Sequence, residues 1–169
     1  MLHRRVTRGD DIGVRYAAPR GEGRDHLAVA RAGKEIMTLP PQEASFFGHV
    51  TFGSGGLRPG RYEAQLVSRG RVRSRSAFWV VAPGARPSVR ARGARISWRN
   101  APANRRDWIG IWKAGDTDLY NDYLAFACTG AGVAGATTFT GLKPGRYVAR
   151  LMKDDGYAEL ARTRFRVGR

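Results

Sequence analysis

The 169-residue sequence contains a single cysteine, Cys128, so it cannot form an intramolecular disulfide. This excludes the class of small secreted domains that are held together by disulfide bonds. The sequence also lacks a run of about 18 apolar residues, which a membrane-spanning helix requires. Its first residues carry charge without an apolar segment behind them, so no signal peptide is predicted. If the chain is the complete protein, we expect it in the cytoplasm.

Helical patterns are scarce as well, because no segment repeats apolar residues at helical spacing behind a capping box. Alternation of apolar and polar residues is widespread instead. In residues 163–167, for example, Phe165 and Val167 fall on one face of the expected strand and two arginines fall on the other. The chain is 42% hydrophobic and has 22 glycines, which suits a packed core with many turns. We therefore expect an all-β protein.

Acidic residues are few, since 14 Asp and Glu stand against 30 Lys and Arg, for a formal net charge of +16. Such a surface attracts nucleic acid, anionic lipid or an acidic protein face. Arg71, Arg73 and Arg75 alternate along one segment and are predicted to form a basic stripe on one strand face. The alternative interpretation is a solvated sheet face, because arginines are spread along the whole chain and no aromatic residues interleave with these three.

The chain contains an internal repeat. Residues 56–62 (GLRPGRY) recur as residues 141–147 (GLKPGRY), and upstream residues 24–29 align with residues 106–111. Two prolines and a glycine lie between the copies, in residues 82–87, and suit a short linker. We therefore predict two domains, a diverged first repeat over residues 1–83 and a second repeat over residues 88–169.

Each repeat carries a Leu-x-Pro-Gly-x-Tyr motif. The Pro-Gly pair predicts a turn that enters a strand, and the tyrosine, Tyr62 or Tyr147, is expected to place its ring in the core. Its hydroxyl would then donate to the upstream backbone, as in the tyrosine corner of immunoglobulin and fibronectin type III sandwiches. Two such corners predict two tandem immunoglobulin-like β-sandwich repeats of about seven strands each. Residues 154–156 (DDG) and Gly70 are expected to form hairpin turns.

The second repeat also resembles a known family. Residues 107–113 (DWIGIWK), residues 121–126 (NDYLAF) and the final hairpin resemble the SKICH-type immunoglobulin-like domain. Residues 100–111 are similar to modules of bacterial multidomain proteins, some of which carry metallophosphoesterase domains. The resemblance covers about residues 88–168 and implies a non-catalytic module for targeting or protein interaction. The first repeat departs from the pattern, because His26 stands where the second repeat has Trp108.

No catalytic constellation is predicted. A nucleophile needs a neighbouring base, but the three histidines lie in the first repeat and Cys128 lies in the second. The glycines of residues 53–56 precede an expected turn and strand rather than a helix, so they do not predict a phosphate-binding loop. We therefore expect neither an enzyme nor a bound cofactor.

Residues 116–122 (DTDLYND) concentrate oxygen ligands of the kind that calcium prefers. The segment lacks the glycine and the closing glutamate of an EF-hand, so a solvated loop with Asx turns is the preferred interpretation and no metal site is predicted.

The remaining candidate is a contact surface for a protein partner. Trp108 and Trp112 are expected to share one strand face, where at least one of them packs in the core. With the acidic loop that follows, they make the predicted partner-binding residues Trp108, Trp112, Asp116, Tyr120 and Tyr123. The predicted function is a non-catalytic binding or targeting module. The alternative is a polyanion binder that acts through Arg71, Arg73 and Arg75.

Overall fold

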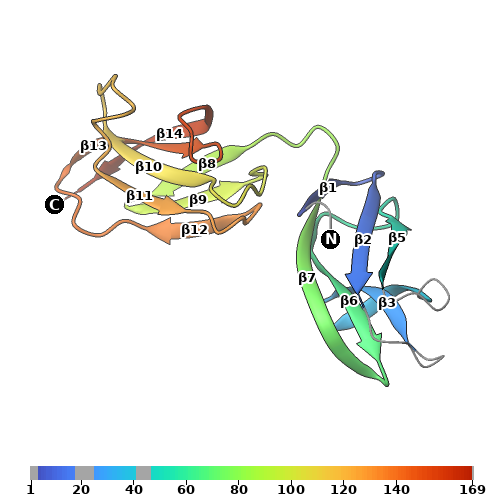
Figure 1. The fold of residues 1–169 in the computed structure, drawn as a ribbon. Coiled ribbons are helices and arrows are strands. Elements are labelled where there is room, and N and C mark those ends of the chain that lie inside the picture. The colour runs from blue at the N-terminus through green and yellow to red at the C-terminus, as the bar shows by residue number, and fades with distance from the viewer. Residues whose placement is uncertain (1–3, 18–24, 41–46, 169) are drawn as a thin grey trace. The chain divides into compact units, whose positions relative to one another are not determined.

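The computed structural model describes residues 4–17, 25–40 and 47–168. Within these residues the chain forms strands β1 to β14 and no helix, which confirms the predicted all-β fold (Figure 1). No helix in this part of the chain is long and apolar enough to cross a membrane. The chain divides into two compact units, Met1–Gly84 and Ala85–Arg169. Residues 1–3 and 24, which the sequence analysis used, lie outside the described residues.

The first unit contains a five-stranded and a two-stranded sheet. The larger sheet has the order β1-β7-β6-β3-β4, with bounds Arg5–Thr7, Arg71–Val81, Gly60–Ser68, His26–Arg31 and Lys34–Leu39. The smaller sheet pairs β2 (Asp11–Ala17) with β5 (Phe47–Gly53). The apolar residues of these strands form one core that both sheets share, and Tyr62, Phe78 and Ile12 are almost fully buried in it.

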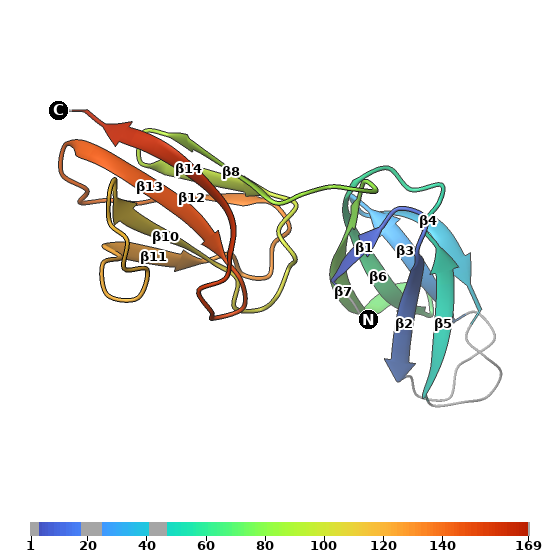
Figure 2. The same cartoon turned by 90° about the horizontal axis from the view of Figure 1, so that it is seen from above.

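The second unit contains a four-stranded and a three-stranded sheet, drawn from two directions in Figures 1 and 2. The four-stranded sheet has the order β11-β10-β13-β14, with bounds Ala125–Cys128, Trp108–Lys113, Gly145–Met152 and Glu159–Val167. The three-stranded sheet has the order β12-β9-β8, with bounds Gly135–Thr138, Arg95–Arg99 and Ser88–Arg92. This two-layer arrangement is that of an immunoglobulin-like sandwich.

The two units repeat the same strand pairing. The order β7-β6-β3-β4 of the first unit corresponds to β14-β13-β10-β11 of the second. The first strand differs, because β1 pairs parallel with β7 whereas β8 pairs antiparallel with β9. The repeat in the sequence is therefore also a repeat in topology, apart from the place of its first strand.

Both predicted tyrosine corners are present. The Tyr62 hydroxyl donates to the Arg58 carbonyl oxygen over 2.7 Å, and the Tyr147 hydroxyl donates to the Lys143 carbonyl oxygen over 2.6 Å. Each tyrosine ring stacks on the phenylalanine that faces it across the hairpin, with centroids 5.7 Å apart for Tyr62 and Phe78 and 5.5 Å apart for Tyr147 and Phe165. Each corner fixes the turn that enters its strand and fills the core beside it.

Candidate functional site

The site begins with strand β10, whose side chains alternate between the two faces of its sheet. Ile109 and Ile111 point into the core, while Trp108 and Trp112 share the other face with Gly110 between them. A Cβ atom on Gly110 would lie 2.3 Å from Cη2 of Trp112 and 2.6 Å from Cζ3 of Trp108. Only glycine lets the two indole rings converge over this position, which explains the Trp-x-Gly-x-Trp pattern.

Trp108 is the centre of an aromatic cluster. Its ring contacts Tyr123, Phe126 and Tyr157 edge-on, with centroid distances of 6.0, 6.2 and 5.6 Å. Its indole N–H donates to the Gly156 carbonyl oxygen over 3.2 Å, which holds the ring in place. Trp108 itself is only 8% exposed, so it forms the floor of the cluster rather than its rim. We call Trp108, Tyr120, Tyr123, Phe126 and Tyr157 the aromatic face.

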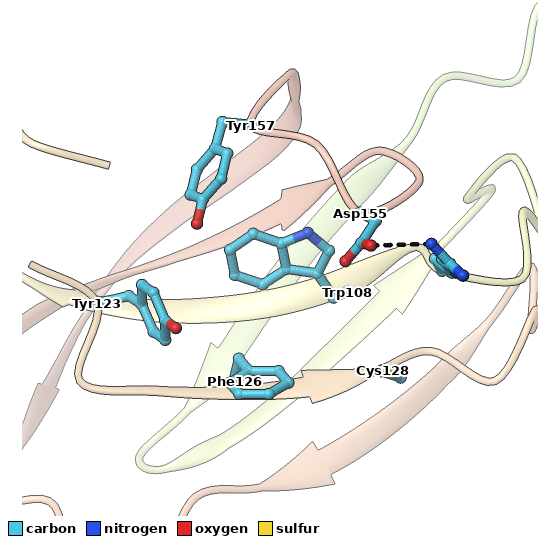
Figure 3. Close-up of a pocket in the computed structure, with 7 residues that line it drawn as sticks. Trp108, Tyr123, Phe126, Cys128, Asp155 and Tyr157 are labelled. Atoms are coloured by element: carbon cyan, nitrogen blue, oxygen red, sulfur yellow. Dashed lines mark hydrogen bonds and ion pairs between the residues drawn. The ribbon is translucent and has the colours of Figure 1, made fainter. Parts of the chain in front are cut away.

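An open pocket of about 330 Å³ lies on this face. Figure 3 shows the Trp108 ring between Tyr157 on one side and Phe126 on the other, with Tyr123 beyond its edge. The dashed line there marks the ion pair that Asp155 makes with Arg106. The complete lining consists of Arg106, Trp108, Tyr123, Phe126, Cys128, Asp155 and Tyr157.

The buried carboxylate of Asp107 joins two sides of the pocket. One of its oxygens accepts the Asn104 backbone N–H over 2.9 Å, and the other accepts the Asp154 backbone N–H over 3.1 Å. Close by, the Asp155 backbone N–H donates to the Arg106 carbonyl oxygen over 3.0 Å. Asp107 is fully buried, so these bonds are shielded from water and tie the loop before β10 to the turn between β13 and β14.

The loop between β10 and β11 is organised by Asp118. Its carboxylate accepts the side-chain amide of Asn121 over 2.8 Å and the backbone N–H groups of Tyr120 and Asn121 over 2.8 and 3.1 Å. These hydrogen bonds, the Asn121 side chain first, lower the pKa of Asp118 below its ordinary value. The geometry is that of an Asx turn, the preferred interpretation of this segment. In the described part of the chain, no group of three or more His, Cys, Asp and Glu side chains is arranged to hold a metal ion.

The Asx turn presents Tyr120 to the opposite loop. The Tyr120 ring stacks on Tyr157 with centroids 4.0 Å apart, and yet 67% of the Tyr120 residue surface remains exposed. Burial raises the pKa of Tyr157 first, and Tyr123, Tyr120, Asp155 and Asp118 raise it further. The fields of two carboxylates therefore reach the Tyr157 hydroxyl at the rim of the pocket.

Trp112 lies beneath this surface and has no exposed area. The Arg150 guanidinium lies over its ring, 5.5 Å from the centroid, and forms an ion pair with Glu159. Trp112 is therefore a core residue that supports the aromatic face, and it offers no atom to a partner. The sequence pattern predicts Trp112 as a contact residue, and its burial corrects this prediction. The interpretation that one of the two tryptophans packs in the core is confirmed.

The structure brings most of the predicted contact residues together. Trp108, Tyr120 and Tyr123 belong to the aromatic face, and Asp116 lies at the start of the loop, where its carboxylate accepts the Lys113 backbone N–H over 2.9 Å. Five further residues that line the pocket were not predicted from the sequence, namely Arg106, Phe126, Cys128, Asp155 and Tyr157. A signal for Phe126 and Cys128 was present, because they alternate with small residues on one strand, but nothing local assigned Tyr157 to this face.

The predicted arginine stripe is interrupted. Arg71, Arg73 and Arg75 are all exposed on β7, but the register with β6 shifts between Leu66 and Val67. Arg75 pairs with Gln65, whereas Arg71 pairs with Ser68. Because those two partners are three positions apart, they point to opposite faces of β6. Arg71 and Arg75 therefore lie on opposite faces, and the predicted single stripe is wrong.

Cys128 is exposed at the pocket, whose lining contains no histidine. His26 lies in the first unit, where its Nε2 atom is 3.1 Å from the Glu35 carboxylate.

No family model matches this chain, and no curated protein matches it. Among solved structures, it is similar to a biofilm associated protein (BSP domain), at 17% identity and a TM-score of 0.32 over 96% of this chain, which spans only 28% of that one. It is also similar to the human OSCAR ligand-binding domain, at 17% identity and a TM-score of 0.43 over 96% of this chain and 93% of that one. A third similar structure is the D0-D1 domain of intimin, at 11% identity and a TM-score of 0.35 over 99% of this chain and 96% of that one. These are distant likenesses of fold.

Proposed function

We propose that the chain is a non-catalytic binding module that contacts a partner protein through the aromatic face of its second unit. The observation that carries the proposal is the exposure of three neighbouring rings, two of which line one open pocket while the third stacks on Tyr157 of its lining. Tyr120 is 67% exposed, Phe126 is 59% exposed and Tyr123 is 37% exposed. Clustered exposed aromatic side chains on a rigid sheet are typical of interaction surfaces.

The architecture of the face supports the same function. Trp108 is held from below by close packing over Gly110 and from the side by its hydrogen bond to Gly156. A rigid aromatic floor loses little conformational entropy when a partner binds, so its contact area is used efficiently. The resemblance of residues 88–168 to the SKICH-type domain also supports a targeting or interaction module over an enzyme.

Capture from the native lysate, with matched variants of the intact chain, tests this function. Phe126→Ser removes an exposed ring from the aromatic face, and Phe47→Ser makes the same change at a position of the first unit that is 76% exposed. We expect a protein partner to be retained at high salt by the wild type and by Phe47→Ser, and to be lost with Phe126→Ser. Equal retention by both variants would place the contact elsewhere on the chain.

The polyanion alternative gives a different pattern in the same experiment. Nucleic acid or anionic lipid held by Arg71, Arg73 and Arg75 would be released steeply as salt rises, with no effect of Phe126→Ser. Because Arg71 and Arg75 lie on opposite faces of the sheet, a polyanion that binds one face cannot contact all three arginines at once.

A further inference from the structure

The aromatic face is bordered by loops that hold most of the acidic residues of the second unit. Its loops are residues 104–107, 113–124 and 153–158, which hold six acidic and four basic residues. The acidic members are Asp107, Asp116, Asp118, Asp122, Asp154 and Asp155. The rest of residues 85–169 holds one acidic residue, Glu159, and twelve basic ones. Acidic residues of the second unit are therefore confined to these three loops and to Glu159, which pairs with Arg150.

Two of these carboxylates lie next to the rings. Asp155 lines the pocket, and Asp118 and Asp155 are both close enough to Tyr157 to raise the pKa of its hydroxyl. Aromatic faces attract cations through their negative quadrupole, and a nearby carboxylate adds to that attraction. An anionic ligand would be repelled by the rings and carboxylates of this site, although the arginines on most of the remaining surface would attract it.

The aromatic cluster already holds one guanidinium from within. Arg150 lies over Trp112 at 5.5 Å and is neutralised by Glu159. On the solvent side, Trp108, Phe126 and Tyr157 surround a pocket with Asp155 at its edge. The outer arrangement offers a similar combination to a second cation, namely indole, phenyl and phenol rings beside one carboxylate.

Arg106 now neutralises Asp155, over 3.1 Å, but both side chains are 69% exposed. Exposed ion pairs of this kind contribute little stability, so the carboxylate can change partners at small cost. An incoming guanidinium can stack on the rings as well as pair with the carboxylate, so it gains a second interaction at this site.

We propose that the pocket takes an arginine side chain of the partner, which stacks among Trp108, Phe126 and Tyr157 and exchanges with Arg106 for the Asp155 carboxylate. This rests on the proposed function, since it names the chemistry that the aromatic face recognises. The occupant is a basic segment of a partner protein, and a second copy of this arginine-rich chain is one outcome that the test separates.

A titration of the intact chain with a blocked tripeptide tests the proposal. The probe is N-acetyl-Gly-Arg-Gly-amide, and its neutral isostere contains citrulline in place of arginine. The readout is the NMR signal of the Trp108 indole N–H. We expect the arginine peptide to shift this signal with at least about tenfold higher affinity than the citrulline peptide. Equal affinity for the two peptides, or preference for a glutamate peptide, would overturn the proposal.

Two exposed variants sharpen the result because they act in opposite directions. Asp155→Asn should weaken the arginine peptide about threefold to tenfold, whereas Arg106→Gln should strengthen it by removing the competing guanidinium. Asp11→Asn and Arg90→Gln are exposed controls outside the face and should change nothing. A weakened Arg106→Gln variant would show that Arg106 binds the ligand itself, which contradicts the exchange.

Failure of the arginine proposal can be distinguished from failure of the proposed binding function. If Phe126→Ser abolishes capture of a protein but the arginine peptide leaves Trp108 unchanged, the binding face stands and its cationic specificity fails. Sedimentation of the chain alone distinguishes self-association from binding of a different protein. Self-association would give dimers whose fraction rises with concentration and which excess arginine peptide dissociates.

Discussion

The ring of Tyr120 stacks on the ring of Tyr157 with the two planes 21° apart and the centroids 4.0 Å apart. Tyr120 belongs to the loop between β10 and β11, and Tyr157 belongs to the turn between β13 and β14. The contact therefore joins two segments that are distant in sequence, one of which carries the pocket residue Tyr157. Because the loop carries Asp118 and the turn carries Asp155, the same contact gathers the aromatic and the acidic groups on one face.

Gly110→Ala should disturb the floor of the pocket. A methyl group there would meet both indole rings at less than 3 Å, and overpacking of this kind costs about 2 kcal/mol of unfolding free energy. We expect a lower melting temperature and a changed near-ultraviolet circular dichroism signal from the displaced tryptophans. Gly168→Ala is the matched control, since its Cβ meets nothing within 4 Å. An unchanged tryptophan signal in Gly110→Ala would contradict the packing described for Trp108 and Trp112.

Asp107→Ala should release the loop before β10 from the turn after β13. The change leaves the backbone N–H groups of Asn104 and Asp154 without the buried carboxylate that accepts from them, which costs about 2–3 kcal/mol. Amide hydrogen exchange should become faster at these two positions. Asp116→Ala, which removes one hydrogen bond from an adjoining loop, should cost about 1 kcal/mol or less. Equal effects of the two changes would argue against a special positioning role for Asp107.

Tyr157 should make the stability of the chain sensitive to alkaline pH. Because burial and the neighbouring carboxylates raise its pKa above the ordinary value of 10.0, the unfolded chain loses this proton first as pH rises. The stabilisation is fully present below pH 10 and is lost as pH rises through the folded pKa. Tyr157→Phe should therefore flatten the fall in melting temperature above pH 10. The ionisation of Tyr157 can be obtained as the difference between the spectrophotometric titrations of the wild type and of Tyr157→Phe. A tyrosine of ordinary pKa in this difference would contradict the raised pKa of Tyr157.

Tyr147→Phe should weaken the second unit alone. The variant keeps the ring stacked on Phe165 and removes only the hydrogen bond to Lys143, worth about 1 kcal/mol. For a unit of this size the expected fall in melting temperature is about 4–8 °C. Tyr62→Phe should have the same effect on the first unit, and calorimetry of the intact chain can compare the two. No loss of stability in either variant would mean that the corners do not stabilise their turns.

The sequence predicted the architecture well because its signals are local. Alternation placed Phe165 and Val167 against the core, and the Pro-Gly-x-Tyr motif predicted both corner hydrogen bonds. The arginine stripe failed because alternation assumes a regular strand, and the irregular register at Leu66 and Val67 breaks that assumption.

The pocket could be predicted only in part. Local pattern placed Trp108 and Trp112 on one face, yet only the packing around Gly110 decides that Trp112 is buried. Tyr157 joins Trp108 because β10 pairs with β13, whose far end leads into the turn that carries Tyr157. A pairing between strands that are distant in sequence leaves no mark in short sequence patterns.

The most direct test of the binding face is site-specific photo-crosslinking of the intact chain in its native lysate. A photoreactive phenylalanine analogue replaces Phe126 in one variant and Phe47 in the other, both of them exposed phenylalanines. We expect a discrete protein adduct from position 126 that survives high salt and denaturation, and none of the same mass from position 47. The same adduct from both positions, or an adduct from position 47 alone, would contradict the assignment of the binding function to the aromatic face.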